Sequence, residues 1–161
     1  TNAILVPTGA GSLTIGNGTN NGNVQAFSAA GDLSVQTMGS STATINSAII
    51  DNGTSTLTKT GTGTLILTGN NSYTGATTVN AGILQLNGAN STTGATVVSG
   101  GTLHLGHANG LGSGALTITG GSLDSSVTNL VNANSNVQNW NGDFSFVGTQ
   151  NLDLGSGAVT L

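Results

Sequence analysis

The chain has 161 residues, with one Lys or Arg, five Asp or Glu and a formal net charge of −4. Charged residues make up 4% of the sequence, against about 25% in ordinary globular proteins. This excludes the clustered basic residues with which proteins bind nucleic acid or an anionic membrane surface. The absence of Cys excludes disulfides and thiolate metal sites.

Short strands are predicted from the beginning of the chain. Leu13-Thr14-Ile15, Leu33-Ser34-Val35 and Ala43-Thr44-Ile45 alternate apolar and polar residues, with Asn and Gly between them. Disordered chains are rich in Pro, Glu and Lys, whereas this alternation is typical of strands.

No apolar run approaches the roughly 20 residues of a transmembrane helix. No signal peptide is visible, so we expect a processed product or a fragment.

The middle of the chain contains a regular sequence repeat. Segments Gly63–Leu67, Gly82–Leu86 and Gly101–Leu105 follow one another at equal spacing and align without gaps, and a weaker copy, Gly121–Ser125, follows one residue late. A second triplet precedes each of the last three copies by the same offset, since Val79 stands before Leu84 as Val98 stands before Leu103. Each repeat therefore predicts two short strands, a tight bend with glycine, and a longer polar turn.

Stacking equivalent triplets from successive coils gives each strand two neighbours and buries alternate side chains. We expect two inner ladders of leucine side chains and one glycine at each bend, where a Cβ would clash or φ is positive. The first ladder is Leu65, Leu84, Leu103 and Leu123; the second is Leu67, Leu86 and Leu105, interrupted by Ser125; the glycines are Gly63, Gly82, Gly101 and Gly121. Ile66, Gln85, His104 and Asp124 are expected to point outward.

The predicted fold is an all-β, right-handed parallel β-helix with about eight coils of roughly 19–20 residues. An antiparallel sandwich also has many short strands, but its spacing is less regular. A collagen-like chain would need glycine at every third position, which this sequence lacks.

The whole chain, 1–161, is predicted to be one segment of solenoid within a longer protein. Residues 1–56 form diverged coils, 57–125 the clear repeats, and 126–161 diverged, Asn-rich coils. In this last part Phe144-Ser145-Phe146, Leu152-Asp153-Leu154 and Val159-Thr160-Leu161 keep the alternation.

The segment 57–86 resembles the autotransporter passenger-associated β-strand repeat. It contains Leu57-Thr58-Lys59-Thr60-Gly61-Thr62-Gly63-Thr64-Leu65-Ile66-Leu67, then Asn71-Ser72-Tyr73-Thr74-Gly75, then a Thr-rich strand and Gly82-Ile83-Leu84. The resemblance implies a right-handed parallel β-helix in a secreted or surface-displayed bacterial protein, near the stalk or the membrane anchor, where the repeat helps export and folding.

Few residues could carry chemistry, although parallel β-helices include polysaccharide lyases and hydrolases. The five carboxylates are far apart in sequence and do not recur at the repeat interval; they are Asp32, Asp51, Asp124, Asp143 and Asp153. We expect no carboxylate or third His near His104 and His107, and therefore no metal site. We expect no enzyme and no cofactor.

Four other side chains have a predicted place. Tyr73 is expected to pack over the turn, while Lys59 and Asp51 are expected to be isolated charges that are solvated or stabilise a turn. Trp140 is expected to cap an edge of the core or to offer a stacking surface for a sugar.

The predicted terminal coils expose unpaired backbone groups, so we expect flanking coils or other copies to cover them. Three functions remain open: a structural stalk or scaffold at the bacterial cell surface or outside the cell, a filament subunit that associates head to tail, and an adhesive module that binds a glycan.

Overall fold

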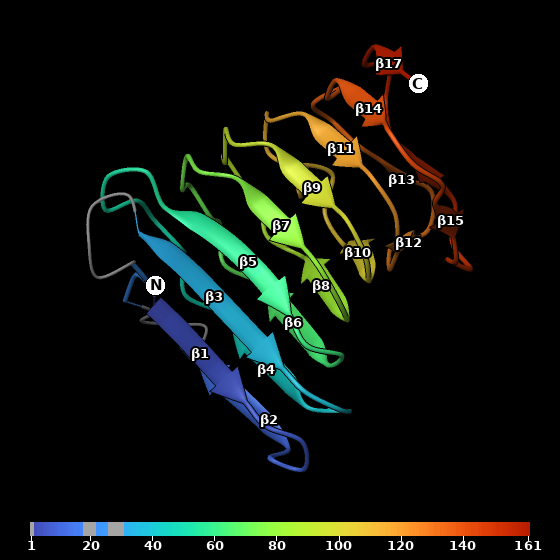
Figure 1. The fold of residues 1–161 in the computed structure, drawn as a ribbon. Coiled ribbons are helices and arrows are strands. Elements are labelled where there is room, and N and C mark those ends of the chain that lie inside the picture. The colour runs from blue at the N-terminus through green and yellow to red at the C-terminus, as the bar shows by residue number, and fades with distance from the viewer. Residues whose placement is uncertain (1, 18–21, 26–30) are drawn as a thin grey trace.

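The computed structural model describes residues 2–17, 22–25 and 31–161. These residues form strands and turns, with no helix among them, and their paired strands run parallel. The chain climbs by one rung per turn from the N-terminal coil to the C-terminal coil (Figure 1). The predicted all-β parallel β-solenoid is confirmed. Within the described ranges there is also no helix long and apolar enough to cross a membrane.

One side of the solenoid is a sheet of eight strands in the order β1-β3-β5-β7-β9-β11-β14-β17. Their bounds are Asn2–Val6 (β1), Asp32–Thr37 (β3), Thr56–Thr60 (β5), Thr77–Val79 (β7), Thr96–Val98 (β9), Leu116–Ile118 (β11), Gln138–Trp140 (β14) and Val159–Thr160 (β17). We call this the first sheet.

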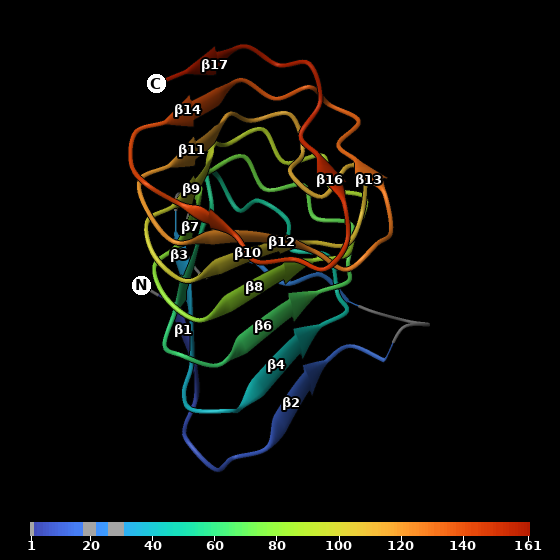
Figure 2. The same cartoon turned by 90° about the vertical axis from the view of Figure 1, so that its right-hand side faces the viewer.

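The second sheet has seven strands in the order β2-β4-β6-β8-β10-β12-β15, and its strands are seen side by side in Figure 2. Their bounds are Ser12–Ile15 (β2), Thr42–Ile45 (β4), Thr64–Leu67 (β6), Ile83–Leu86 (β8), Thr102–Leu105 (β10), Ser122–Ser125 (β12) and Ser145–Phe146 (β15). One coil is therefore a strand of the first sheet, a short bend, a strand of the second sheet and a longer return turn.

The core consists of like side chains stacked on like. Leu65, Leu84, Leu103 and Leu123 lie in register on consecutive strands and are buried. Leu67, Leu86 and Leu105 form a second buried ladder, in which Ser125 takes the next position. The residues between them alternate outward, because successive side chains of a strand point to opposite faces.

The number of complete turns is about six, somewhat lower than the eight coils predicted, since six turns join the seven strands of the second sheet. The reason is that the N-terminal coils are longer than the repeat. Asn2 pairs with Leu33, and Leu33 pairs with Leu57, so each of these coils takes up more of the chain than a repeat coil does. Part of the predicted N-terminal coils, at 18–21 and 26–30, lies outside the described residues.

A third sheet, which the repeat pattern did not predict, closes the last coils. It consists of β13 (Leu130–Val131) and β16 (Leu152–Asp153), and Figure 2 shows it beside the second sheet. The Asn-rich part of the chain thus has strands on three sides of the coil.

Replacement of Leu84 by Ala tests the core. Leu84 is buried between Leu65 and Leu103, so removal of its side chain should lower the free energy of unfolding by about 3 kcal/mol. Gln85→Ala, on the outer side of the same strand, should change it by less than about 0.5 kcal/mol. Urea unfolding followed by circular dichroism measures both, and equal losses would contradict the assigned orientation.

Candidate functional site

The predicted turn glycines lie at the bend between the two main sheets. Gly82, Gly101 and Gly121 have φ of +67°, +67° and +84°. Gly63 lacks a positive φ, but a Cβ there would collide with the backbone carbonyl oxygen of Ser41 in the coil before. At these bends backbone therefore lies directly against backbone, and side chains have no room.

Lys59 lies inside the core, next to the bends that carry these glycines. It pairs in register with Val35 and Val79 on the inner side of the first sheet, and its side chain is 0% exposed. Its Nζ donates hydrogen bonds to the carbonyl oxygens of Thr60 at 2.6 Å, Gly61 at 2.8 Å and Ala81 at 3.1 Å. Of the two roles expected for Lys59, the solvated charge is wrong, because Lys59 occupies an inward position of its strand. The other role, stabilisation of a turn, agrees with its bonds to Gly61 and Ala81 in the bends.

A pair of buried asparagines lies in the longer return turn. The side chain of Asn71 accepts a hydrogen bond from the Ile49 amide at 2.8 Å and donates one to Asn90 Oδ1 at 3.0 Å. Asn90 Nδ2 in turn donates to the Gly110 carbonyl at 2.7 Å. Two side-chain amides thus connect turns of four successive coils.

Tyr73 is part of the core rather than a cover over the turn. Its side chain is 2% exposed, and its hydroxyl lies 2.6 Å from Thr77 Oγ1. Burial raises the pKa of Tyr73 to about 12, although the hydrogen bond with Thr77 opposes the shift.

Asp51 stabilises a turn, which is one of the two roles expected for it. Its carboxylate accepts hydrogen bonds from the backbone amides of Ser55 and Thr74, each at 3.0 Å. These two residues belong to successive coils, so the contact also joins neighbouring turns.

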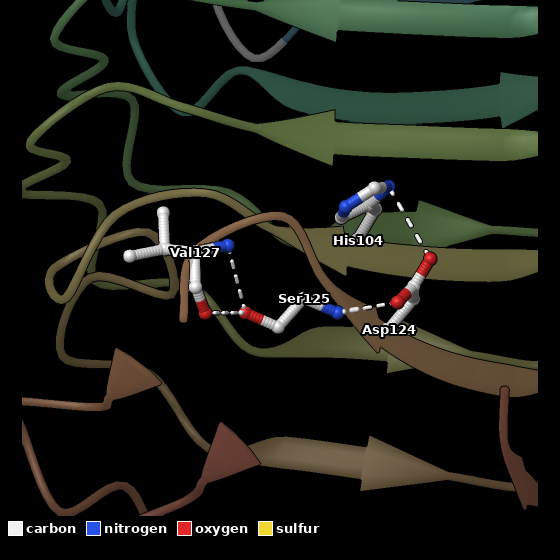
Figure 3. Close-up of polar contacts among 4 residues, drawn as sticks. All are labelled: His104, Asp124, Ser125 and Val127. Carbon is white, nitrogen blue, oxygen red and sulfur yellow. Dashed lines mark hydrogen bonds and ion pairs between the residues drawn. The ribbon is translucent and has the colours of Figure 1, made fainter. Parts of the chain in front are cut away.

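His104 and Asp124 form a pair on the outer face of the second sheet (Figure 3). His104 Nδ1 lies 3.6 Å from Asp124 Oδ2, and both side chains are partly exposed. The expectation that no carboxylate lies near His104 was therefore wrong. Asp124 also accepts a hydrogen bond from the Ser125 amide at 2.7 Å, while His104 Nε2 is buried with no hydrogen-bond partner.

These neighbours do not form a nucleophilic triad. Ser125 follows Asp124 on the strand and points to the inner side, where its hydroxyl donates to the Val127 carbonyl at 3.0 Å (Figure 3). His107 lies in the turn, where its Nδ1 accepts a hydrogen bond from the Asn109 amide. Across the described part of the chain, no three His, Cys, Asp or Glu side chains are grouped to hold a metal ion.

Trp140 lies at the end of β14, in register with Ile118, and packs against the core. Its ring meets Phe144 edge to face, with 5.2 Å between the ring centroids. Both rings line a hollow of about 570 Å³ together with Asn141, Gly142, Asp143 and Leu161. The indole Nε1 is buried without a hydrogen-bond partner.

Sequence reasoning missed the asparagine pair and the inward lysine, although both left a signal. Asn71 and Asn90 are separated by 19 positions, which is also the spacing of the strand repeat. Lys59 stands two positions after Leu57, which places both on the same face of a strand.

Loss of the Asn90 side chain should destabilise the folded protein. Asn90→Ala leaves the buried Gly110 carbonyl and the Asn71 amide groups without a partner, which should lower the free energy of unfolding by about 2 kcal/mol. Asn70→Ala is the matched control, because Asn70 makes one exposed hydrogen bond and should cost about 0.5 kcal/mol. Urea unfolding of both variants measures the difference, and equal losses would exclude a special role for the buried pair.

The pH dependence of stability should report on Lys59. Burial lowers the pKa of Lys59 from 10.5 to about 8. Between these values the unfolded chain binds the proton more tightly than the folded protein does, so the free energy of unfolding should rise with pH. The useful window ends near pH 10, where Tyr73 of the unfolded chain starts to ionise and opposes the gain.

Urea midpoints measured from pH 8 to pH 10 should therefore increase for the wild-type protein. They should stay level for Lys59→Met, which has no titrating group at this position. A wild-type midpoint that falls over this window would contradict the lowered pKa.

The comparison with known families bears on the repeat coils. Residues 57–86 and 82–105 match the family described as the passenger-associated-transport-repeat. No curated protein and no solved structure matches the chain. The matched residues contain Lys59, Tyr73, the asparagine pair and three of the bend glycines. The chain is thus a parallel β-solenoid whose coils at 57–105 fit an autotransporter passenger repeat, a family that implies a secreted or surface-exposed domain.

Proposed function

We propose that this chain is a non-catalytic structural segment, a stalk or scaffold, of a bacterial extracellular or cell-surface protein associated with the outer membrane. One observation carries the proposal. The buried polar side chains of the repeat coils bond to backbone groups of neighbouring coils, as Lys59, Asn71 and Asn90 do. Their hydrogen-bonding capacity is used to hold one coil to the next.

The distribution of charge supports an extracellular role. Lys59 is the chain's one cleavage site for a protease that cuts after Lys or Arg, and it is fully buried. A protease must open the coil to reach it, because cleavage needs an exposed and extended backbone. Resistance of this kind suits a protein exposed to secreted proteases.

Deletion of one complete coil tests a structural role. Removal of residues 82–100 takes out one repeat and joins Ala81 to Gly101, so that β10 can stack on β6 in the same register. The shortened protein should fold, be exported and be displayed like the parent, with a rod shorter by one step of about 4.8 Å. Circular dichroism, surface labelling and electron microscopy of the intact surface protein measure these properties.

The matched control removes about half a coil, residues 82–90. This deletion moves the following strands out of register and should prevent folding. The structural role would be contradicted if the one-coil deletion kept the fold and display but abolished a catalytic or ligand-binding activity of the parent.

A filament subunit is the second candidate. The last coil carries exposed apolar side chains at inward positions of its strands, such as Phe146 on β15 and Val159 on β17. More solenoid would cover them, either flanking coils or a second copy that associates head to tail. Negative-stain electron microscopy at increasing concentration should show fibres of uniform width if copies associate, and isolated rods if they do not.

An adhesive role rests on the hollow beside Trp140 and Phe144. Aromatic rings next to the Asp143 carboxylate and the Asn141 amide offer the stacking and polar contacts that a glycan requires. Binding to a glycan array should then be lost in Trp140→Ala, while binding that survives this substitution would exclude the site.

A further inference from the structure

Lys59 is the one Lys or Arg of the chain, and it lies among aliphatic side chains. Val35 and Val79 flank it in the ladder of the first sheet. An ammonium group is expensive to bury unless its N–H groups find acceptors. The three acceptors around Nζ match the three N–H groups of a protonated lysine.

These acceptors belong to two different coils. Thr60 ends β5 and Gly61 begins the bend between β5 and β6, whereas Ala81 lies in the next bend, between β7 and β8. The ammonium group therefore connects the two bends directly. It does so at the corner of the coil, where the regular strand pairing is interrupted.

The space for this ammonium group depends on the residue of the next bend. A Cβ at Gly82 would lie 2.8 Å from Lys59 Nζ and would also meet the carbonyl oxygens of Gly61 and Gly63. Lys59 and Gly82 are therefore complementary: the first fills the corner from one coil, and the second leaves room for it from the next.

Coil length changes at this position. The two coils before β5 are long and unequal, whereas those after it are nearly equal in length. One column of paired positions in the first sheet runs through Asn2, Leu33, Leu57, Thr77, Thr96 and Leu116. In the ladder that holds Lys59, the later positions are Val79, Val98 and Ile118, which cannot make such bonds.

We propose that Lys59 is a positioning residue that cross-links two consecutive bends and fixes the register at which the regular repeat begins. The bonds hold the bend after β5 against the bend after β7. The coil that follows therefore starts in a defined register. The inference goes beyond the proposed structural role, which also rests on the bonds of Asn71 and Asn90 to neighbouring coils. Its failure would therefore remove one of three supporting contacts and leave the other two in place.

Nuclear magnetic resonance of the full chain labelled with ¹⁵N-lysine provides a direct test, since Lys59 gives the single Nζ signal. A hydrogen-bonded, buried ammonium group should exchange its protons slowly and give a visible NH₃⁺ signal at neutral pH. In a sample whose carbonyl carbons also carry ¹³C, the signal should show couplings through the hydrogen bonds to those carbons. A signal that exchanges as fast as that of free lysine would overturn the proposal, and this measurement needs no variant.

Amide hydrogen exchange of Lys59→Met tests the effect on register. Methionine keeps the length and apolar stem but donates no hydrogen bond. The amides of Gly63 and Ile83, which bond across the bends to Thr37 and Gly63, should exchange about tenfold faster or more. The Ser122 amide, which bonds to Gly101 farther along the solenoid, should change by less than about twofold.

Val98→Ala is the matched control for a general loss of packing. Val98 occupies the same ladder two coils later and makes no side-chain hydrogen bond. It should lower stability without selectively exposing the amides of Gly63 and Ile83. If Lys59→Met stays folded and leaves these two amides as protected as in the wild type, Lys59 does not fix the register.

Discussion

Backbone pairing between successive coils is the constraint on which the rest of this structure depends. At the bends, the Ile83 amide donates to Gly63, and the Thr102 amide donates to Gly82 one coil later. Since neighbouring strands are about 4.8 Å apart, whatever occupies a position in one coil meets its counterpart in the next. Leucine accordingly stacks on leucine in the core, and glycine is required where two bends touch.

Lys59 and the two buried asparagines make their bonds where this pairing is interrupted. The corner beside β5 and the long return turn both carry carbonyl and amide groups that the strands do not pair. Lys59 supplies donors at the corner, and Asn90 joins Asn71 to Gly110 in the turn. Each contact also reaches into a neighbouring coil. In a chain with so few charged residues, these groups give the stacked coils a specific register that leucine packing alone would leave weakly defined.

The sequence was sufficient for the fold class and for the strands of the repeat block, because equal spacing without gaps has one simple structural explanation. It was insufficient for the N-terminal coils, whose lengths differ from each other and from the repeat. The two-residue strands β13 and β16 are too short to show alternation. The contact of His104 with Asp124 was within reach, because both occupy the same outward position of successive repeats. Distance along the chain was the wrong measure of their separation.

Lys59 shows a different limit of sequence reasoning. A lone lysine among threonines is usually solvated, so composition argued against burial. Alternation within β5 argued for burial, because Leu57 and Lys59 share a face, and alternation was the better guide. A strand in a closed coil cannot turn one residue outward without moving its neighbours. The cost of burying the charge is offset by three carbonyl groups that the bend leaves unpaired.

The use of these polar groups bears on function. Catalysis or reversible binding needs a polar group that can change partners, whereas Lys59, Asn90 and the Tyr73 hydroxyl are each held by fixed contacts inside the solenoid. The outward pair of His104 and Asp124 lies on an open sheet face, with the nearest hydroxyl, that of Ser125, turned inward. Polar groups that join neighbouring coils in this way support the structural role that we propose for the repeat coils.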